Sequence, residues 1–260
     1  MQIRTFIPIL LAATCAVTPG HAASLVNLGS ASNFAVLAGA AITNTGPSII
    51  NGNIGVGAAG MISGFPPGVV NGSIHAGDAL AVLALADLVI AAGGAGAQSC
   101  GTNLTGFDLG TLVLTPGVYC FASSAQLTGA LTLDGLGDAS AEWLFQIGST
   151  LTTATAASVV FTNGASGGNL YWLVGSSATL GTGTAFGGTI MALASITVTT
   201  AASIVDGRLL ARTGAVTLDS NDISGPRVDA VPEPLTWLSM LVGFGAIGSS
   251  LRYRRGAIAG

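Results

Sequence analysis

A run of short repeats between Val118 and Ser224 constrains the fold of this chain more than any other sequence feature. Roughly five imperfect copies of one pattern follow one another, joined by turns that contain glycine or asparagine. Each copy begins with a mostly apolar run, such as Glu142 to Phe145, and continues with a strand rich in Thr, Ser and Ala, such as Ser195 to Thr199. Repeats of about 20 residues, made of short strands and tight turns, predict a β-solenoid in which each coil packs on its neighbours.

The Thr-rich strands should present one side to the core and the other to solvent, because alternate side chains of a strand point in opposite directions. The residues expected to point inwards are Leu127, Leu151, Leu180, Val198 and Leu218. An earlier segment, Ala40 to Ser48, is expected to add one more such strand. The outward positions form a candidate binding surface that comprises Ala41, Thr43, Ser124, Gln126, Thr128, Thr150, Thr152, Ser177, Thr179, Ser195, Thr197, Thr199, Ala215 and Thr217. Stacked coils would place these groups in rows about 4.8 Å apart.

The charge of the chain is low for a solvated body. Charged residues make up 7%, the net charge is −4, and the sequence has no lysine and only two glutamates. This balance is typical neither of a disordered chain nor of a nucleic-acid-binding protein. A large uncharged face therefore predicts contact with something regular or apolar. The alternative is that Thr is simply a good strand former on a solvated face.

Catalytic and metal chemistry find little support. His75 is the only histidine beyond Ala23, and we expect it at the surface near the start of a helix. Metal sites need clusters of His, Cys or carboxylates, and the sequence suggests none. We therefore predict no catalytic residue, no metal and no cofactor. Paired carboxylates for glycoside cleavage are a minor alternative.

One long helix is expected at about 78–92, because this stretch is rich in Ala and Leu and is followed by Gly93-Gly94, which can stop a helix. With about 15 residues and Asp87 inside, it would be too short and too polar to span a bilayer. The segment from Gly60 to Gly72 is expected to be a loop. The helix should cover the solenoid side that carries Tyr119, Trp143, Tyr171 and Trp172, and so leave the Thr side bare.

The first residues predict export. Residues 1–23 combine a positive start, an apolar core and a small-residue exit, which is typical of a secretory signal cleaved after Ala22 or Ala23. In an oxidising compartment Cys100 and Cys120 can pair in a disulfide. The alternative is two buried free thiols.

The tail is separate from the body at 24–225. A linker at 226–234 leads to residues 235–255, where an uncharged apolar run near the lower length limit of a membrane helix ends in arginines that favour a cytoplasmic C-terminus. The tail resembles a PEP-CTERM sorting signal in Pro232, Glu233, Pro234, Arg252, Arg254 and Arg255. The resemblance implies a Gram-negative bacterium, a transmembrane C-terminal helix before processing, and an exosortase-type sorting enzyme as partner. After processing, the protein would be retained at the cell surface or secreted.

The body, from about Leu25 to Ser224, resembles the microbial ice-binding proteins. The matching motifs are Asn33 to Ala38, Gly52 to Val56, Leu114 to Tyr119, Trp143 to Gln146, and Asp206 to Ala211 followed by Ala215 to Leu218. The resemblance implies a mainly β fold: a right-handed irregular β-solenoid of triangular cross-section with one long α-helix packed along one face. It also places the contact with ice on the strands that directly follow the aromatic runs.

These expectations predict a monomeric antifreeze or ice-recrystallisation-inhibition protein that is not an enzyme. Its partner would be the ice crystal surface, and nucleic acid is not expected as a partner. Gln126, Gly181 and Asp219 interrupt the Thr rows, so we expect moderate activity. The alternative is a cell-surface adhesin or exopolysaccharide-matrix protein on the same scaffold, since proteins with PEP-CTERM signals often accompany exopolysaccharide production.

Overall fold

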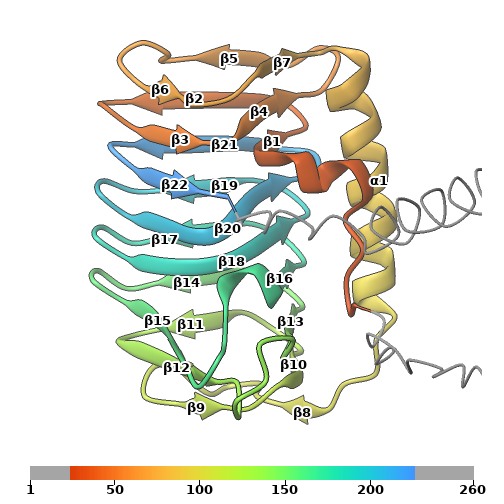
Figure 1. Cartoon of the computed structure of the whole chain (residues 1–260), viewed down its shortest axis with the longest axis vertical. Helices are drawn as coiled ribbons and strands as arrows, with labels where there is room; N and C mark the ends of the chain where they lie inside the picture. The colour runs from red at the N-terminus through yellow and green to blue at the C-terminus, as the bar shows by residue number, and fades with distance from the viewer. Residues whose placement is uncertain (1–23, 226–260) are drawn as a thin grey trace, which may run out of the picture.

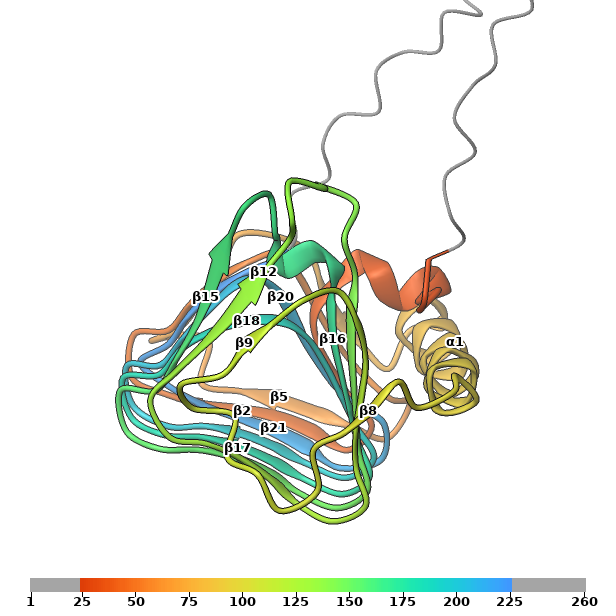
Figure 2. The ribbon, with the colours of Figure 1, turned by 90° about the horizontal axis from the view of Figure 1, so that it is seen from below.

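The computed structural model describes residues 24–225. These residues form stacked coils of triangular cross-section with one helix lying alongside, so the expected mainly β solenoid is confirmed (Figure 2). The signal segment expected at 1–23, and the linker, sorting motif and transmembrane helix expected at 226–255, lie outside the described residues.

Two sides of the triangle share one 15-stranded sheet, and the third side is a separate seven-stranded sheet. The side that we call the helix face contains, in spatial order, β8 (Thr102–Asn103), β10 (Gly117–Phe121), β13 (Trp143–Ile147), β16 (Leu170–Val174), β18 (Ala185–Ala192), β20 (Ser203–Ala211), β1 (Phe34–Ala38), β4 (Asn53–Val56) and β7 (Ile74–Ala76).

The second face contains β9 (Val113–Leu114), β12 (Ala130–Asp134), β15 (Ser158–Thr162), the first parts of β18 and β20, β22 (Asp222–Ser224), β3 (Ile49–Asn51) and β6 (Val69–Val70). The third side, which we call the Thr face, contains β11 (Ala125–Leu127), β14 (Leu151–Thr153), β17 (Ala178–Leu180), β19 (Ile196–Val198), β21 (Ala215–Asp219), β2 (Ala41–Thr45) and β5 (Met61–Ser63). Every pairing between these strands is parallel, as stacked coils require.

The long strands β18 and β20 bend around one corner of the triangle. Their register shifts between Gly187 and Thr189. Gly188 has a φ of 89°, and a Cβ placed on it would lie 2.7 Å from the carbonyl oxygen of Leu170. Only glycine tolerates both the positive φ and the close backbone, so the corner depends on it.

Apolar side chains fill the inside of the solenoid. The inward leucines and valine expected on the Thr-rich strands are all buried, which confirms the alternation. An aromatic stack runs through successive coils of this core. The ring centroids of Tyr119 and Phe145 are 5.3 Å apart, those of Phe145 and Trp172 are 4.2 Å apart, and those of Trp172 and Phe186 are 5.0 Å apart. The Trp172 indole N–H donates to the carbonyl of Gly187 at 3.1 Å, so this buried polar group is satisfied.

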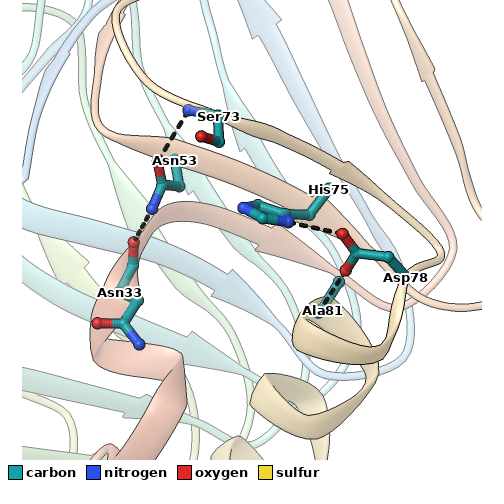
Figure 3. A network of polar contacts seen from close by, with 6 residues as sticks. All are labelled: Asn33, Asn53, Ser73, His75, Asp78 and Ala81. Carbon is teal, nitrogen blue, oxygen red and sulfur yellow. Dashed lines mark hydrogen bonds and ion pairs between the residues drawn. The ribbon is translucent and has the colours of Figure 1, made fainter.

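The helix α1 spans Ala79–Gly96 and is longer than the expected 78–92. Its start is capped by Asp78, whose carboxylate accepts the Ala81 backbone N–H at 3.0 Å and also contacts His75 at 2.7 Å (Figure 3). Gly93-Gly94 does not stop it. The helix continues because Ala95 is buried against the body and the Gln146 amide donates to the Ala95 carbonyl at 2.8 Å. Tertiary contacts therefore override the local preference of glycine.

The helix covers the expected side of the solenoid, but through other side chains. Leu144, Tyr171, Met191 and Leu210 pack in one cluster with α1, whereas Tyr119, Trp143 and Trp172 belong to the interior core. The expectation for these last three was wrong because neighbouring residues on a strand face opposite ways. With 18 residues, α1 is long and apolar enough to cross a membrane by length and composition, so the expectation that it is too short was also wrong. In the structure it lies along the body (Figure 1).

The order of coils in space differs from their order in the chain. The N-terminal strand β2 stacks on β21, the last strand of the Thr repeats, and α1 then carries the chain back from β7 at one end to β8 at the other (Figure 1). The expected loop from Gly60 to Gly72 is instead part of a terminal coil that contains β5 and β6. These strands pair with β2 and β3, whose backbone groups would otherwise lack partners on that side.

Two short 3-10 helices and one covalent link complete the body. They are η1 (Gly29–Asn33) and η2 (Gly167–Asn169). Cys100 and Cys120 form a disulfide that joins the segment after α1 to β10.

The aromatic stack predicts where the body is most sensitive to truncation. Trp172→Ala should lower the free energy of unfolding by about 3–5 kcal/mol, because it leaves a cavity between two rings. Phe107→Ala removes another aromatic ring, but one that is 64% exposed, and should change stability by less than about 0.5 kcal/mol. Guanidinium unfolding of both variants checks this, and equal effects would contradict the described core.

Candidate functional site

The Thr face carries one continuous central row of outward side chains. Each member is the register partner of the next across adjacent parallel strands. In spatial order the row is Gln126, Thr152, Thr179, Thr197, Thr217, Thr43 and Ser63. Neighbouring members are therefore separated by the strand spacing of about 4.8 Å. The row crosses the whole seven-stranded sheet.

A flanking row lies two residues earlier along each strand, about 6.6 Å away. It consists of Ser124, Thr150, Ser177, Ser195, Ala215, Ala41 and Met61. Hydrogen bonds link neighbouring coils here: the Thr150 hydroxyl donates to the Ser124 hydroxyl at 2.8 Å, and the Ala215 N–H donates to the Ser195 hydroxyl at 3.2 Å. On the other side of the central row, Thr128, Thr199 and Thr45 occupy a less regular third row that also contains Asp219, the register partner of Thr45.

The outward placement follows from the core. Leu, Ile, Val and Ala at alternate positions are buried inside the coil, which turns the intervening side chains to solvent. None of the fourteen residues predicted for this surface is buried. Figure 2 shows α1 beside another side of the triangle, and no described element covers the Thr face. The structure thus brings all the predicted surface residues together on one open sheet.

Hydroxyl and methyl groups dominate the chemistry of this face. Thr and Ser offer hydroxyls as both donors and acceptors, and Thr adds a methyl group. Thr is β-branched and stiff at χ1, so the groups are held rigidly. Some hydroxyls are fixed further: Thr199 donates to the Leu180 carbonyl at 2.8 Å, and Thr43 donates to Thr217 at 3.4 Å. The result is a preformed array of hydroxyl and methyl groups.

Charge enters the Thr face only near its margins. Asp219 lies in the third row, where its carboxylate accepts hydrogen bonds from the hydroxyls of Thr200 and Ser220. The backbone of Asp108 forms an isolated parallel β-bridge with Gln126 at one end of the sheet, and the Asp108 carboxylate accepts the backbone N–H of Thr128 at 3.0 Å. Neither carboxylate lies in the central row, so the row carries no charge from Thr152 to Ser63.

Several other titratable groups have structural partners away from this face. His75 and Asp78 meet at the start of α1, next to the Asn53 amide that bridges Asn33 and Ser73 (Figure 3). The Ala81 N–H and then His75 lower the pKa of Asp78. Within residues 24–225 no group of three His, Cys, Asp or Glu side chains is placed to hold a metal ion.

Sequence reasoning missed three residues of this surface: Ser63, Met61 and Thr45. Ser63 and Met61 pair with Thr43 and Ala41 and extend two rows by one strand. They were lost inside the expected loop. The signal that could have found them is their spacing, since each follows its partner in the chain by one repeat length.

Known proteins are similar to this chain in the sequence that produces this geometry. The profile of the family described as ice-binding-like matches residues 36–224. An ice-binding protein from Nostoc sp. (strain HG1) is 49% identical over 244 residues, which cover 92% of this chain and 90% of that protein. An ice-binding protein from Colwellia sp is 33% identical over 225 residues, which cover 81% of this chain and 87% of the relative.

Solved structures agree in fold. An ice binding protein from an Antarctic Biological Consortium is 44% identical with a TM-score of 0.74, covering 84% of this chain and 95% of that one. The ice-binding protein of the Antarctic ascomycete Antarctomyces psychrotrophicus is 42% identical with a TM-score of 0.75, covering 78% and 98% of the two chains.

Two adjacent threonines of β14 provide a test of the outward row. Thr152 is exposed, whereas Thr153 is 3% exposed and bonds to the Thr184 hydroxyl at 2.8 Å and the Gly181 N–H at 2.8 Å. Thr153→Val should cost about 1–3 kcal/mol of unfolding free energy, because it leaves buried partners unsatisfied. Thr152→Val should stay within about 0.5 kcal/mol. Urea unfolding measures both; a reversed order would mean that the register is shifted by one residue.

Proposed function

The chain belongs to the ice-binding-like family, and from this premise we propose that it adsorbs to ice through its Thr face. The observation that supports this most is the central row, in which threonines on five successive strands stand in register and uncovered. Activity as an antifreeze or as an inhibitor of ice recrystallisation follows, because adsorbed protein blocks growth locally.

The proposed mechanism uses the rigidity of the face. Hydroxyls and methyls at fixed spacing order the adjacent water into a pattern that continues the ice lattice. The rows are held by a packed core, so binding requires little ordering of side chains and loses little conformational entropy. The near absence of charge helps as well, because a charged group holds its hydration water strongly.

The second face makes a useful comparison. It exposes Val113, Val160 and Val205, whose side chains are 64%, 40% and 51% exposed. However, β15 pairs with β18 only through Ser158 and Ala185, so the strands of this face do not form one regular grid. We therefore assign ice contact to the Thr face alone.

The alternative of an adhesin or exopolysaccharide-binding protein gains no support from the fold or from the relatives, which are named for ice binding. The expectation that the protein is not an enzyme stays a prediction.

We also propose the same processing as the sequence suggested. Removal of a secretory signal at 1–23 would export the body at 24–225. The linker at 226–234 and the tail at 235–255 would then serve as a PEP-CTERM anchor that an exosortase-type enzyme processes, placing the protein at the cell surface or in the medium.

Ice affinity purification tests the function directly. The recombinant body should be enriched in the ice fraction, and recovery only in the liquid fraction would contradict ice binding. The double variant Thr197→Tyr and Thr217→Tyr should lose most of the activity with thermal stability nearly unchanged, because bulky rings break the central row on exposed positions. Val205→Tyr on the second face is the matched control and should keep full activity. Equal losses in both proteins would argue against the Thr face.

A gain-of-function variant makes the complementary test. Gln126 interrupts the central row at the strand next to Thr152, and its side chain is exposed. Gln126→Thr extends the threonine row by one strand, so thermal hysteresis at equal concentration should increase. Thr128→Gln in the irregular third row is the control and should not increase it. A decrease in hysteresis with Gln126→Thr would show that row continuity does not determine activity.

A further inference from the structure

The first described residues are fastened to one carboxylate. The Ser24 hydroxyl donates to one oxygen of Glu142 at 2.7 Å, and the Leu25 backbone N–H donates to the other oxygen at 2.6 Å. Glu142 directly precedes β13, 118 residues away from Ser24 in sequence. Both oxygens of the carboxylate, one of only two glutamates in the chain, thus bind the start of the body.

The segment that follows is well packed. Val26, Leu28 and Ala31 are buried in the cluster that holds α1 against the helix face. The carboxylate of Asp87 on α1 accepts the Ser30 N–H at 2.8 Å as well as the Ser30 hydroxyl. The start of the body is therefore an ordered strap between α1 and the solenoid.

We propose that Glu142 is the receiving site for the amino group that leader removal creates. In this step a signal peptidase adds water across the peptide bond before Ser24. The leader keeps a carboxylate, and the body gains an amine, which takes up a proton to become an ammonium group. The inference rests on the proposed export of the body and is independent of what the Thr face binds.

Geometry supports the pairing. Cleavage before Ser24 leaves the ammonium on the residue whose hydroxyl already touches Glu142. The amino nitrogen and hydroxyl of one serine are roughly 3 Å apart by covalent geometry, so the ammonium lies within about 6 Å of the carboxylate. In the uncleaved chain the same nitrogen is a neutral amide, so the ion pair exists only after processing.

At mildly alkaline pH the α-amino group is the main group near this site that changes its charge, because the neighbouring groups keep theirs. Tyr171 on β16 contacts this site, and burial is the main cause that raises its pKa, so it stays neutral. Arg208 on β20 is the neighbouring cation; burial lowers its pKa, and its Nε donates to the Ser32 carbonyl at 3.1 Å. On α1 the nearest charged group of the strap is Asp87, whose pKa the Ser30 bonds lower.

The sign of the pH effect follows. A free α-amino group titrates near pH 7.7–8.0, and an opposite charge raises its pKa in the folded protein. The pair therefore stabilises the body fully below about pH 7.7, and the contribution is lost as pH rises through the raised folded-state pKa.

The experiment uses the full chain exported from a Gram-negative host. Mass spectrometry of the purified body should find Ser24 as its first residue. Thermal unfolding is then compared between the wild type and Glu142→Gln from pH 6 to pH 10. The variant should melt about 2–4 °C lower at pH 6–7, and this gap should narrow towards pH 10 as the amine loses its charge.

Two controls separate the outcomes. Insertion of four glycines before Ser24 moves the amine away from an intact Glu142. This variant should also melt below the wild type at pH 6–7, and the difference in melting temperature should narrow towards pH 10. Asp134→Asn, at the partly buried end of β12 on the second face, should show a gap that does not change between pH 7 and pH 10. A constant gap for Glu142→Gln, or a first residue elsewhere, overturns the proposal. These variants should bind ice as strongly as the wild type. If the wild type itself fails to bind ice, that result contradicts the proposed role of the Thr face and leaves the proposal for Glu142 unaffected.

Discussion

Hydrogen bonding between successive parallel strands sets the geometry of every surface on this molecule. Because the spacing is about 4.8 Å throughout, any residue type that recurs in register becomes a row. Inside, the rule stacks Tyr119, Phe145 and Trp172 into a column of rings. Outside, it stacks Thr152, Thr179 and Thr197 into a row of hydroxyls and methyls. The core and the candidate site are thus two sides of one register, and neither can change without the other.

The covered helix face explains, by contrast, why the Thr face can stay open. On the helix face, outward side chains such as Leu144 and Leu210 are large and apolar, and α1 buries them. On the Thr face most outward residues are small and uncharged, so exposure costs little free energy and a cover is not required. Composition therefore divides the solenoid into a side that must be covered and a side that is free to meet an external surface.

Sequence reasoning succeeded where local alternation decides the outcome. The burial of Leu127, Leu180 and Leu218, and the exposure of the threonines between such residues, follow from a period of two. It failed where non-local contacts decide. Gly93-Gly94 continues the helix because the distant Gln146 binds the helix end, and the stretch from Gly60 to Gly72 becomes strands because β2 offers it an edge. Neither Gln146 nor β2 can be identified as a partner from the local propensity of these segments. The regular spacing of the repeats, however, could have identified the pairing with β2.

The most consequential contact is also the least local. The central row is continuous only because β2 docks on β21, which joins Thr43 to Thr217 across 174 residues. Closing so long a loop loses chain entropy before any pairing is gained, so this junction is expected to form late in folding. Two devices stabilise it from outside the Thr face. The helix α1, which is about 27 Å long, connects the N-terminal coils to the opposite end of the stack. The stack itself is about 38 Å long, because it contains eight strand spacings. The strap at Ser24 and Leu25 joins the N-terminal coil to β13 through Glu142. A binding row shared by both ends of the chain thus depends on contacts that lie on the other side of the molecule.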